Sequence, residues 1–536
     1  MAFRTNEFQT ISLDDEFNRL SERTKKIVVN SWAKDFADIV FPAINESRFS
    51  VLYSDNKASR SNTPVNIIVG ALMIKSMFGQ SDDDLMESIC CDVRYKYALH
   101  TTSYEEQPVS DRTFSRFRER LYNYQVQTGE DLLDEEMKHL SSVYAKFMNL
   151  HSNIKRMDSM MIASSAKRMS RLEIIYAVNS NAVALMHQLG ADDLIPDGLE
   201  HYLSADDRND VIYYCKEDDV ASRLAIAIKE AELIKQAMEP DEWHEFSQYR
   251  LLIRVINEQS KYDEDGNIEP KDNSEITSSS LQNPSDPDAT YRKKAGKDNK
   301  GYSANFVETI GDDGNSLITD FDFQPNTYSD SQFCKDQILK HSGEDTVTII
   351  ADGAYGGIEN QELAAENNVV LVTTALNGKP VDEIYSEFEY NEDGTKVLKC
   401  PAGYAPNSST YYESNGTCRI TMAKSCCGNC PYKDRCKAKE QRNNYVLTTS
   451  SKMTARAKYM KALKTEDYIK LTRMRNAVEG IPSIMRRKYH VDRSPFKGLI
   501  RTGWTFSLGV GAYNIQKLIK YRSKTRGKST LQPILG

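Results

Sequence analysis

Hydrophobic positions recur with a helical period over roughly the first 150 residues. The segment TPVNIIVGALMIKSMFGQSDDDLMESI, residues 63–89, predicts an apolar helix that ends at Gly79 and a second helix capped by Ser81. A third helix is predicted from VSDRTFSRFRERLYNY, residues 109–124. Its apolar stripe consists of Phe114, Phe117 and Leu121, and a second stripe consists of Arg112, Arg116 and Arg120.

Beyond about residue 150, short apolar runs predict strands. NIKRMDSMMIAS, residues 153–164, predicts a strand that carries Asp158, and residues 300–325 predict two strands joined by the turn GDDGN. TVTIIADGAYGG, residues 346–357, predicts a buried strand that ends in Asp352 and a glycine-rich turn, and residues 367–376 predict one more strand. Helices flank these strands, so the order of elements predicts an α/β protein.

The predicted sheet is interrupted by additions. A strongly periodic, acidic helical segment follows Asp158, and it ends in a polar loop or linker over residues 262–288. The cysteine-bearing segment predicts an irregular β insertion. The predicted divisions are a helical domain over 1–150, the first part of the core over 151–385 with an acidic helical insertion over 169–290, the cysteine-bearing insertion over 386–445, and a basic helical part over 446–536.

Composition limits the class of protein. The chain has 536 residues, of which 40% are hydrophobic, and the mean hydropathy is −0.58. The sequence has no apolar run long enough to span a bilayer, and MAFRTNEFQTISLDDEF at the N-terminus lacks the apolar core of a signal peptide. These features predict a soluble, cytoplasmic protein.

Charge is distributed unevenly along the chain. The net charge is −8, but residues 451–536 contain 20 Lys and Arg against 4 Asp and Glu, a net charge of +16. Residues 191–290 contain 9 Lys and Arg against 25 Asp and Glu, a net charge of −16. This split predicts one surface for a polyanion and another that avoids it, and a solvated basic tail is the alternative. The arginine stripe over 112–120 suits phosphate or major-groove contact, or is simply a solvated face.

Three acidic residues are candidates for a divalent-cation site. A carboxylate at the end of a buried strand, such as Asp352, is held rigidly and still reaches a metal. Two or three converging carboxylates suit Mg²⁺, which prefers oxygen ligands, and Asp158 is the first candidate partner. Glu479 is the best third candidate, because Arg475 four residues earlier shares its helix face and cations follow it. The alternative for Glu479 is an ordinary ion pair.

Cysteines are concentrated in one segment. Cys418, Cys426, Cys427, Cys430 and Cys436 lie close together, and Cys400 lies just upstream. In a long chain without a signal peptide, such clustering favours metal over disulfides. The Cys427-x2-Cys430 spacing suits tetrahedral zinc, with Cys400 and Cys436 completing the set. Cys418 or Cys426 could replace one ligand, and reduced cysteines packing a small insertion are the alternative.

These motifs together resemble those of the DDE transposases of bacterial insertion sequences. RMDSMMI resembles the first acidic motif with Asp158, IIADGAYGG the second with Asp352, and RNAVEG the third with Glu479. The related pattern Tyr-x2-Arg-x3-Glu-x6-Lys is met by Arg475 and Glu479, whereas Thr472 and Arg486 stand at its tyrosine and lysine positions. RSNTPVNIIVGALM and SDRTFSRFRERL resemble the helical N-terminal domain of these transposases.

The resemblance implies a ribonuclease H-like catalytic core that performs two-metal phosphoryl transfer, with Mg²⁺ ions about 3.5–4 Å apart and Mn²⁺ able to substitute. It implies that Asp158 bridges both ions, that Asp352 holds one and that Glu479 holds the other. The implied partners are terminal inverted repeats, target DNA and a second copy of the chain, in the bacterial cytoplasm at the nucleoid. The predicted DNA-binding residues are Arg112, Arg116, Arg120, Arg475, Arg486, Arg487 and Lys488. A catalytically inactive DNA-binding relic and a different Mg²⁺-dependent nuclease remain alternatives.

Overall fold

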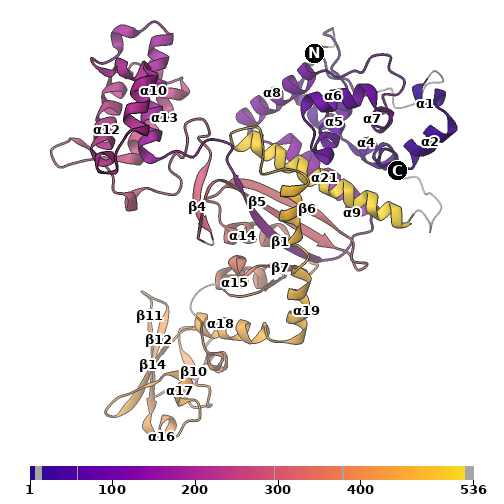
Figure 1. Ribbon diagram of the computed structural model, residues 1–536. Helices are drawn as coiled ribbons and strands as arrows, with labels where there is room; N and C mark the ends of the chain where they lie inside the picture. Colours follow the sequence, from indigo (N-terminus) through magenta and orange to yellow (C-terminus); the bar gives the residue numbers. More distant parts are fainter. Residues whose placement is uncertain (7–14, 57, 295, 377–379, 526–536) are drawn as a thin grey trace.

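A six-stranded sheet lies at the centre of the molecule (Figure 1). The computed structural model describes residues 1–536 except residues 7–14, 57, 295, 377–379 and 526–536, and it is a mixed α/β structure. The strands of this sheet are β1 (Ile154–Ala163), β4 (Thr290–Lys294), β5 (Lys297–Ile310), β6 (Ser316–Pro325), β7 (Val347–Ala351) and β8 (Val369–Thr373). The predicted strands are therefore present.

The strand order places the two strands that carry aspartates next to each other. The order is β4-β5-β1-β7-β8, and β6 also pairs with β5. Strand β5 runs antiparallel to β1, β4 and β6, whereas β1, β7 and β8 are parallel. Because Arg156 on β1 lies opposite Ile350 on β7, Asp158 is level with Asp352 two residues further along. Parallel pairing thus brings the two carboxylates level with each other at the point where β7 ends.

Helices cover both faces of the sheet. Residues of β1 alternate between the two cores: Met157 packs with α14 (Asp330–Lys340) and α15 (Ile358–Glu366), whereas Met160 and Ile162 pack with the N-terminal helices. Those helices are α1 (Glu16–Arg19), α2 (Glu22–Val29), α3 (Trp32–Asp35), α4 (Phe41–Ala43), α5 (Val65–Phe78), α6 (Asp82–Cys91), α7 (Val93–Ala98), α8 (Asp111–Thr128) and α9 (Leu132–Phe147). Gly79 ends α5 in the left-handed conformation, and Ser81 caps α6, as predicted.

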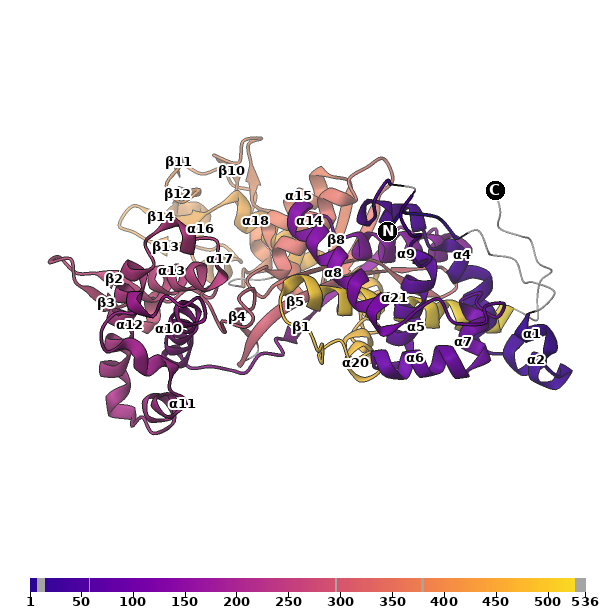
Figure 2. The same ribbon diagram turned by 90° about the horizontal axis from the view of Figure 1, so that it is seen from above.

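The C-terminal helices are α18 (Ser451–Ala462), α19 (Glu466–Arg475), α20 (Gly480–Arg487) and α21 (Leu499–Thr525). Helices α20 and α21 return to the core of the N-terminal helices, whereas Ala457 of α18 packs in the core of the cysteine-bearing insertion. Helix α21 lies along α5 and α9 and against β6, so both ends of the chain cover one face of the sheet (Figures 1 and 2). Within the described part of the chain, none of the helices, α21 included, is long and apolar enough to cross a membrane.

The two insertions each have a hydrophobic core of their own. The acidic insertion consists of α10 (Arg171–Gln188), α11 (Ala205–Arg208), α12 (Val220–Ala237), α13 (Ser247–Gln259) and the hairpin β2 (Ser260–Tyr262) and β3 (Ile268–Pro270). The cysteine-bearing insertion consists of β9 (Glu389–Tyr390), β10 (Val397–Lys399), β11 (Ser408–Tyr412), β12 (Thr417–Ala423), α16 (Lys424–Cys427), α17 (Lys433–Cys436), β13 (Lys439–Glu440) and β14 (Asn444–Thr449). Figure 1 shows them projecting from the sheet in different directions.

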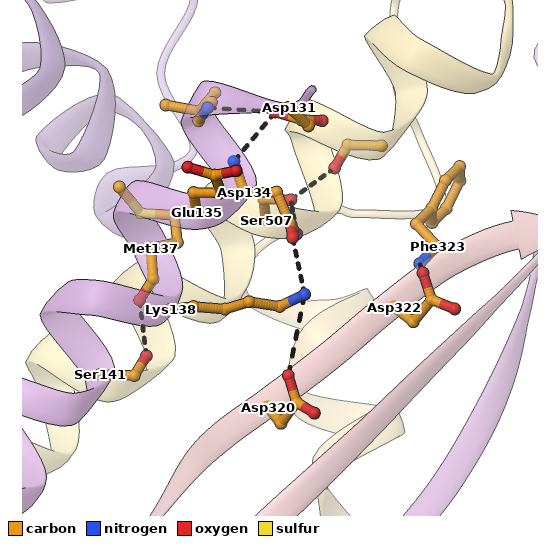
Figure 3. A network of polar contacts seen from close by, with 12 residues as sticks. Asp131, Asp134, Glu135, Met137, Lys138, Ser141, Asp320, Asp322, Phe323 and Ser507 are labelled. Carbon is orange, nitrogen blue, oxygen red and sulfur yellow. Dashed lines mark hydrogen bonds and ion pairs between the residues drawn. The ribbon is translucent and has the colours of Figure 1, made fainter. Parts of the chain in front are cut away.

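A polar network joins helices α9 and α21 to strand β6 (Figure 3). The Lys138 ammonium lies 2.7 Å from Asp134 Oδ2 and 3.7 Å from Asp320 Oδ1, and the Ser507 hydroxyl donates to Asp134 Oδ1 at 3.3 Å. Burial raises the pKa of Asp134 to about 6, although Lys138 acts in the opposite direction. The packing of the N-terminal helices on the sheet therefore includes a carboxyl group that titrates near neutral pH.

This raised pKa predicts a defined pH dependence of stability. The folded protein holds a proton on Asp134 more tightly than the unfolded chain, so stability falls as pH rises from about 4 to about 6 and stays reduced above that. We compare the melting temperature of Asp134→Asn with that of wild type at each pH. The difference, variant minus wild type, should be more positive at pH 8 than at pH 5. In free energy of unfolding, this change between pH 5 and pH 8 should be on the order of 1–3 kcal/mol, since each pKa unit corresponds to about 1.4 kcal/mol.

The control for this measurement is Asp312→Asn, on the exposed turn between β5 and β6. Its melting temperature relative to wild type should not change between pH 5 and pH 8. A difference between Asp134→Asn and wild type that is independent of pH would contradict the assignment.

Candidate active site

Asp158 lies in the middle of β1 and presents one carboxylate oxygen towards α19. Its Oδ1 accepts a hydrogen bond from the Ser159 N–H at 2.9 Å, and its Oδ2 lies 3.8 Å from Nη2 of Arg475. The side chain is 16% exposed. Burial raises the pKa of Asp158, against the opposing effects of the Ser159 N–H and Arg475. The strand thus holds a largely buried carboxylate with one oxygen engaged and one turned towards a cation.

Asp352 follows β7 and is held in the same way. Its Oδ1 accepts hydrogen bonds from the Gly353 N–H at 2.6 Å and the Thr374 hydroxyl at 3.0 Å. Its Oδ2 lies 3.8 Å from Nη2 of Arg475. The side chain is 49% exposed, so this oxygen also faces the surroundings. Both aspartates therefore anchor Oδ1 to the backbone and present Oδ2.

The small residues after Asp352 are required by a close approach of two chain segments. A Cβ atom at Gly356 would lie 2.6 Å from Thr373 Oγ1, and one at Gly353 would lie 2.9 Å from the Ala375 Cβ. Both distances are shorter than real Cβ contacts. Glycines at these two positions thus allow the turn after β7 to approach the end of β8 closely.

Glu479 lies immediately before α20, in a turn between two helices. Its Oε1 lies 2.7 Å from Nη1 of Arg475, and its side chain is 59% exposed. Helix α19 ends at Arg475 and α20 begins at Gly480, so the prediction that the two residues share the face of one helix is wrong. The ion pair forms nevertheless, because Asn476 and Glu479 keep right-handed helical backbone angles across the interruption.

The Arg475 guanidinium joins the three acidic residues. It contacts Asp158 from β1, Asp352 from the end of β7 and Glu479 from the turn before α20. The Arg475 side chain is only 11% exposed, so it lies between these carboxylates rather than in solvent. The structure therefore gathers three acidic residues that are far apart in the sequence, and it does so around a cation.

Such a set of donors suits a hard divalent cation. Carboxylate oxygens are the ligands that Mg²⁺ prefers, and three carboxylates each have an oxygen within 4 Å of the Arg475 guanidinium. Across the described ranges, no three His, Cys, Asp or Glu side chains are close enough to form a ready-made metal site. At the acidic site the Arg475 guanidinium contacts all three carboxylates and supplies the positive charge.

A buried ion pair fixes the segment that carries Arg475. The Arg156 Nε donates to Glu308 Oε2 at 2.6 Å, and its Nη1 donates to the carbonyl oxygen of Met474 at 2.7 Å. The Glu308 side chain is fully buried and also accepts from the Ser316 hydroxyl at 2.5 Å. The sequence analysis missed Arg156, although a charged residue within an apolar strand pattern is a signal that could have pointed to it.

A second cation near Asp158 was also missed. The Lys294 ammonium on β4 donates to the Ser159 hydroxyl at 3.1 Å and to Asp330 Oδ2 at 3.2 Å. Asp330 is buried, and Arg292 also donates to it. Burial raises the pKa of Asp158, and Lys294 is one of the positive charges that oppose this rise. Positive charge therefore approaches the acidic site from the β4 side as well as from α19.

The predicted DNA-binding residues fall into two groups. On α8, Arg112 and Arg116 are exposed, whereas the Arg120 guanidinium packs over the Tyr53 ring at 4.8 Å. At the end of α20 and just after it, Arg486, Arg487 and Lys488 are exposed. The Arg486 guanidinium donates to the carbonyl oxygen of Met161 at 3.0 Å, which places it beside the β1 strand that carries Asp158.

The cysteines predicted to bind zinc line one small cavity. Cys400, Cys427, Cys430 and Cys436 all contribute to its wall, together with Cys426. Burial, and then the neighbouring thiols of Cys436, Cys400, Cys430 and Cys426, raise the pKa of Cys427 to about 11. Cys418 lies elsewhere on β12, where its thiol donates to the carbonyl oxygen of Thr395. All these cysteines are free thiols.

Comparison with known proteins yields two family matches. Residues 399–519 match the transposase DDE domain, and residues 28–120 match a transposase domain of the DUF772 family. The first match contains Arg475 and Glu479, and the second contains the arginine stripe of α8. The two matches are those expected of a DDE transposase of an insertion sequence, so the predicted resemblance is confirmed.

Among solved structures, the chain is similar to a cryo-EM structure of the piggyBac transposase synaptic complex with hairpin DNA. The match has 8% identity and a TM-score of 0.30, and it covers 95% of this chain and 79% of that chain. A likeness this slight does not define the fold. No curated protein matches at a significant level.

Proposed function

We propose, from the premise that this chain carries two transposase domains, that it is a DNA transposase which binds the terminal inverted repeats of its element, cleaves its ends and joins them to target DNA. The observation that carries this proposal is the contact of one guanidinium with Asp158, Asp352 and Glu479. Only the third of these residues lies in the matched DDE domain. Its convergence with the two aspartates supports the same assignment for them.

In this proposal the sheet is a ribonuclease H-like core. Its support is the mixed sheet β6-β5-β1-β7-β8, in which the central strand β1 and its parallel neighbour β7 supply the first two acidic residues. The turn between α19 and α20 supplies the third, after the cysteine-bearing insertion in the sequence. When bound, two Mg²⁺ ions would activate the attacking water or 3′-hydroxyl and stabilise the leaving oxygen.

The protein's own residues prepare this site. Asp158 and Asp352 would hold metal through Oδ2, because their Oδ1 atoms are engaged by backbone N–H groups. A divalent cation would compete with Arg475 for the same oxygens. Arg475 would then be free to bind a DNA phosphate, which a guanidinium can contact bidentately.

The remaining cations would position DNA. Arg486, Arg487 and Lys488 are exposed at the end of α20 and just after it, and Arg486 contacts β1. Phosphate contacts set register and orientation rather than sequence preference. Arg112 and Arg116 on α8 would contact the terminal repeat, whereas Arg120 is engaged with Tyr53. A second copy of the chain would pair the two ends of the element, in the cytoplasm of a bacterial cell.

The test is cleavage of a labelled duplex that carries the inverted repeats bracketing the gene. We expect the full-length protein to bind this duplex in either Mg²⁺ or EDTA and to cut at the repeat end only with Mg²⁺. Binding without cleavage in Mg²⁺ and in Mn²⁺ would indicate a catalytically inactive relic. Metal-dependent cutting with no preference for the repeat would indicate a different nuclease.

A further inference from the structure

The cysteine cavity lies inside the hydrophobic core of the insertion between Asp352 and Glu479. Its volume is about 30 Å³. A cavity needs roughly 10–15 Å³ to hold one water molecule, so this space accommodates a single atom-sized guest. Apolar side chains form much of the remaining wall, including Phe388, Ile420 and Met422. Such a wall offers a water molecule few hydrogen-bond partners.

Thiols reach this cavity from three separate segments. Cys400 follows β10 in a turn closed by the Gly403 N–H bonding to its carbonyl oxygen at 2.8 Å. Cys427 ends α16, and the Cys430 N–H bonds to its carbonyl oxygen at 3.4 Å. Cys436 ends α17, and Lys437 after it has a left-handed backbone with φ of 55°. Turns and helix ends thus place the four cysteines at the wall of the cavity.

Ordinary core packing accounts poorly for this arrangement. Cys418 is the cysteine of the insertion that behaves as a core residue, since it is fully buried on β12 and bonded to a backbone carbonyl. The four cavity cysteines are only partly buried, and they remain free thiols although they line the same space. Thiolates are ligands that select zinc and softer metals, so four free thiols around one small cavity favour a metal site.

We propose that Cys400, Cys427, Cys430 and Cys436 bind one structural Zn²⁺ ion in a tetrahedral four-sulfur site. All four cysteines line the cavity, but as they lie they do not form a closed ligand set. Zn–S bonds of about 2.3 Å require them to turn inward. Binding releases the four thiol protons to solvent and involves no change of oxidation state.

The ion would hold together the base of the insertion. The Tyr385 hydroxyl donates to the carbonyl oxygen of Cys436 at 2.9 Å, and Arg435 forms an ion pair with Asp382 at 2.7 Å. These contacts tie the metal-binding turns to the short helix Glu383–Glu387, which packs against α18. Helix α18 leads directly to α19 and Arg475. The zinc site therefore stabilises the insertion that precedes α18 and α19, the helices that lead along the chain to Glu479.

The experiment is metal analysis of the full-length protein purified without chelator. We expect about one zinc per chain, and after replacement by Co²⁺ the visible absorption of a tetrahedral thiolate site. Removing the metal from wild-type protein should make four further thiols reactive and lower the melting temperature. These readouts need no variant and no DNA-cleavage assay, so they are independent of the proposed function.

Variants then define the ligands. Cys427→Ser and Cys436→Ser should lose most of the bound zinc, whereas Cys426→Ser, in the same cavity, and Cys90→Ser, exposed on α6, should keep it. Retention of zinc by Cys436→Ser with loss in Cys426→Ser would overturn the assigned ligand set. Wild-type protein with a zinc ratio near zero and no cobalt spectrum would overturn the site itself.

Discussion

Asp352→Asn is expected to abolish cleavage of the element's ends, with a loss of at least about a thousandfold, while binding to the terminal repeat survives. The asparagine side-chain oxygen can still accept from the Gly353 N–H and the Thr374 hydroxyl, so the turn after β7 should keep its shape. What is lost is the negative charge of Oδ2, the oxygen that faces Arg475 and the proposed metal site. Cleavage of the labelled duplex and its gel shift measure the two properties separately.

A matched control distinguishes the loss of the Asp352 carboxylate from the loss of any nearby negative charge. Asp345→Asn changes an exposed aspartate in the loop before the same strand and should cleave at the wild-type rate. Addition of Mg²⁺ should raise the melting temperature of wild type and of Asp345→Asn, and it should have little effect on Asp352→Asn. If Asp352→Asn retained substantial cleavage, the assignment of the active site would be wrong.

Arg156→Met is expected to give the largest loss of stability. It removes the closest cation from the fully buried Glu308 carboxylate and leaves only Lys517, at 3.7 Å; breaking a buried ion pair typically costs about 3–5 kcal/mol. It also removes the donor to the Met474 carbonyl, immediately before Arg475. The variant should melt at a clearly lower temperature than wild type and cleave more slowly. Lys155→Met, on the neighbouring position of β1, loses one hydrogen bond to Thr309 and should cost far less.

A double variant separates stability from positioning. Adding Glu308→Gln to Arg156→Met removes the uncompensated charge and should recover much of the lost melting temperature. Cleavage should remain impaired, because the Met474 carbonyl still lacks its donor and the turn that carries Arg475 and Glu479 is less firmly held. Equal recovery of stability and cleavage would show that Arg156 acts on stability alone.

The local elements follow from short-range patterns in the sequence. The apolar run before Asp352, the turn between β5 and β6, and the caps at Gly79 and Ser81 all appear where hydrophobic period and turn chemistry predict them. The break between α19 and α20 was not predicted, because Arg475 to Glu479 contains no proline and its only neighbouring glycine follows Glu479. Backbone angles there remain near helical, so the break leaves little trace in composition.

In the candidate site, some features follow from neighbours along the chain and others from contacts between distant segments. The sequence by itself determined which acidic residues accompany the predicted strands, which cysteines have metal-like spacing, and where the positive charge is concentrated, because these depend on neighbours along the chain. Only the tertiary structure decided that β1 pairs with β7 in a register that levels Asp158 with Asp352, and that Arg475 lies between them and Glu479. Strand pairing and the burial of Arg156 against Glu308 depend on contacts between distant segments, and a linear pattern of residues does not specify such contacts.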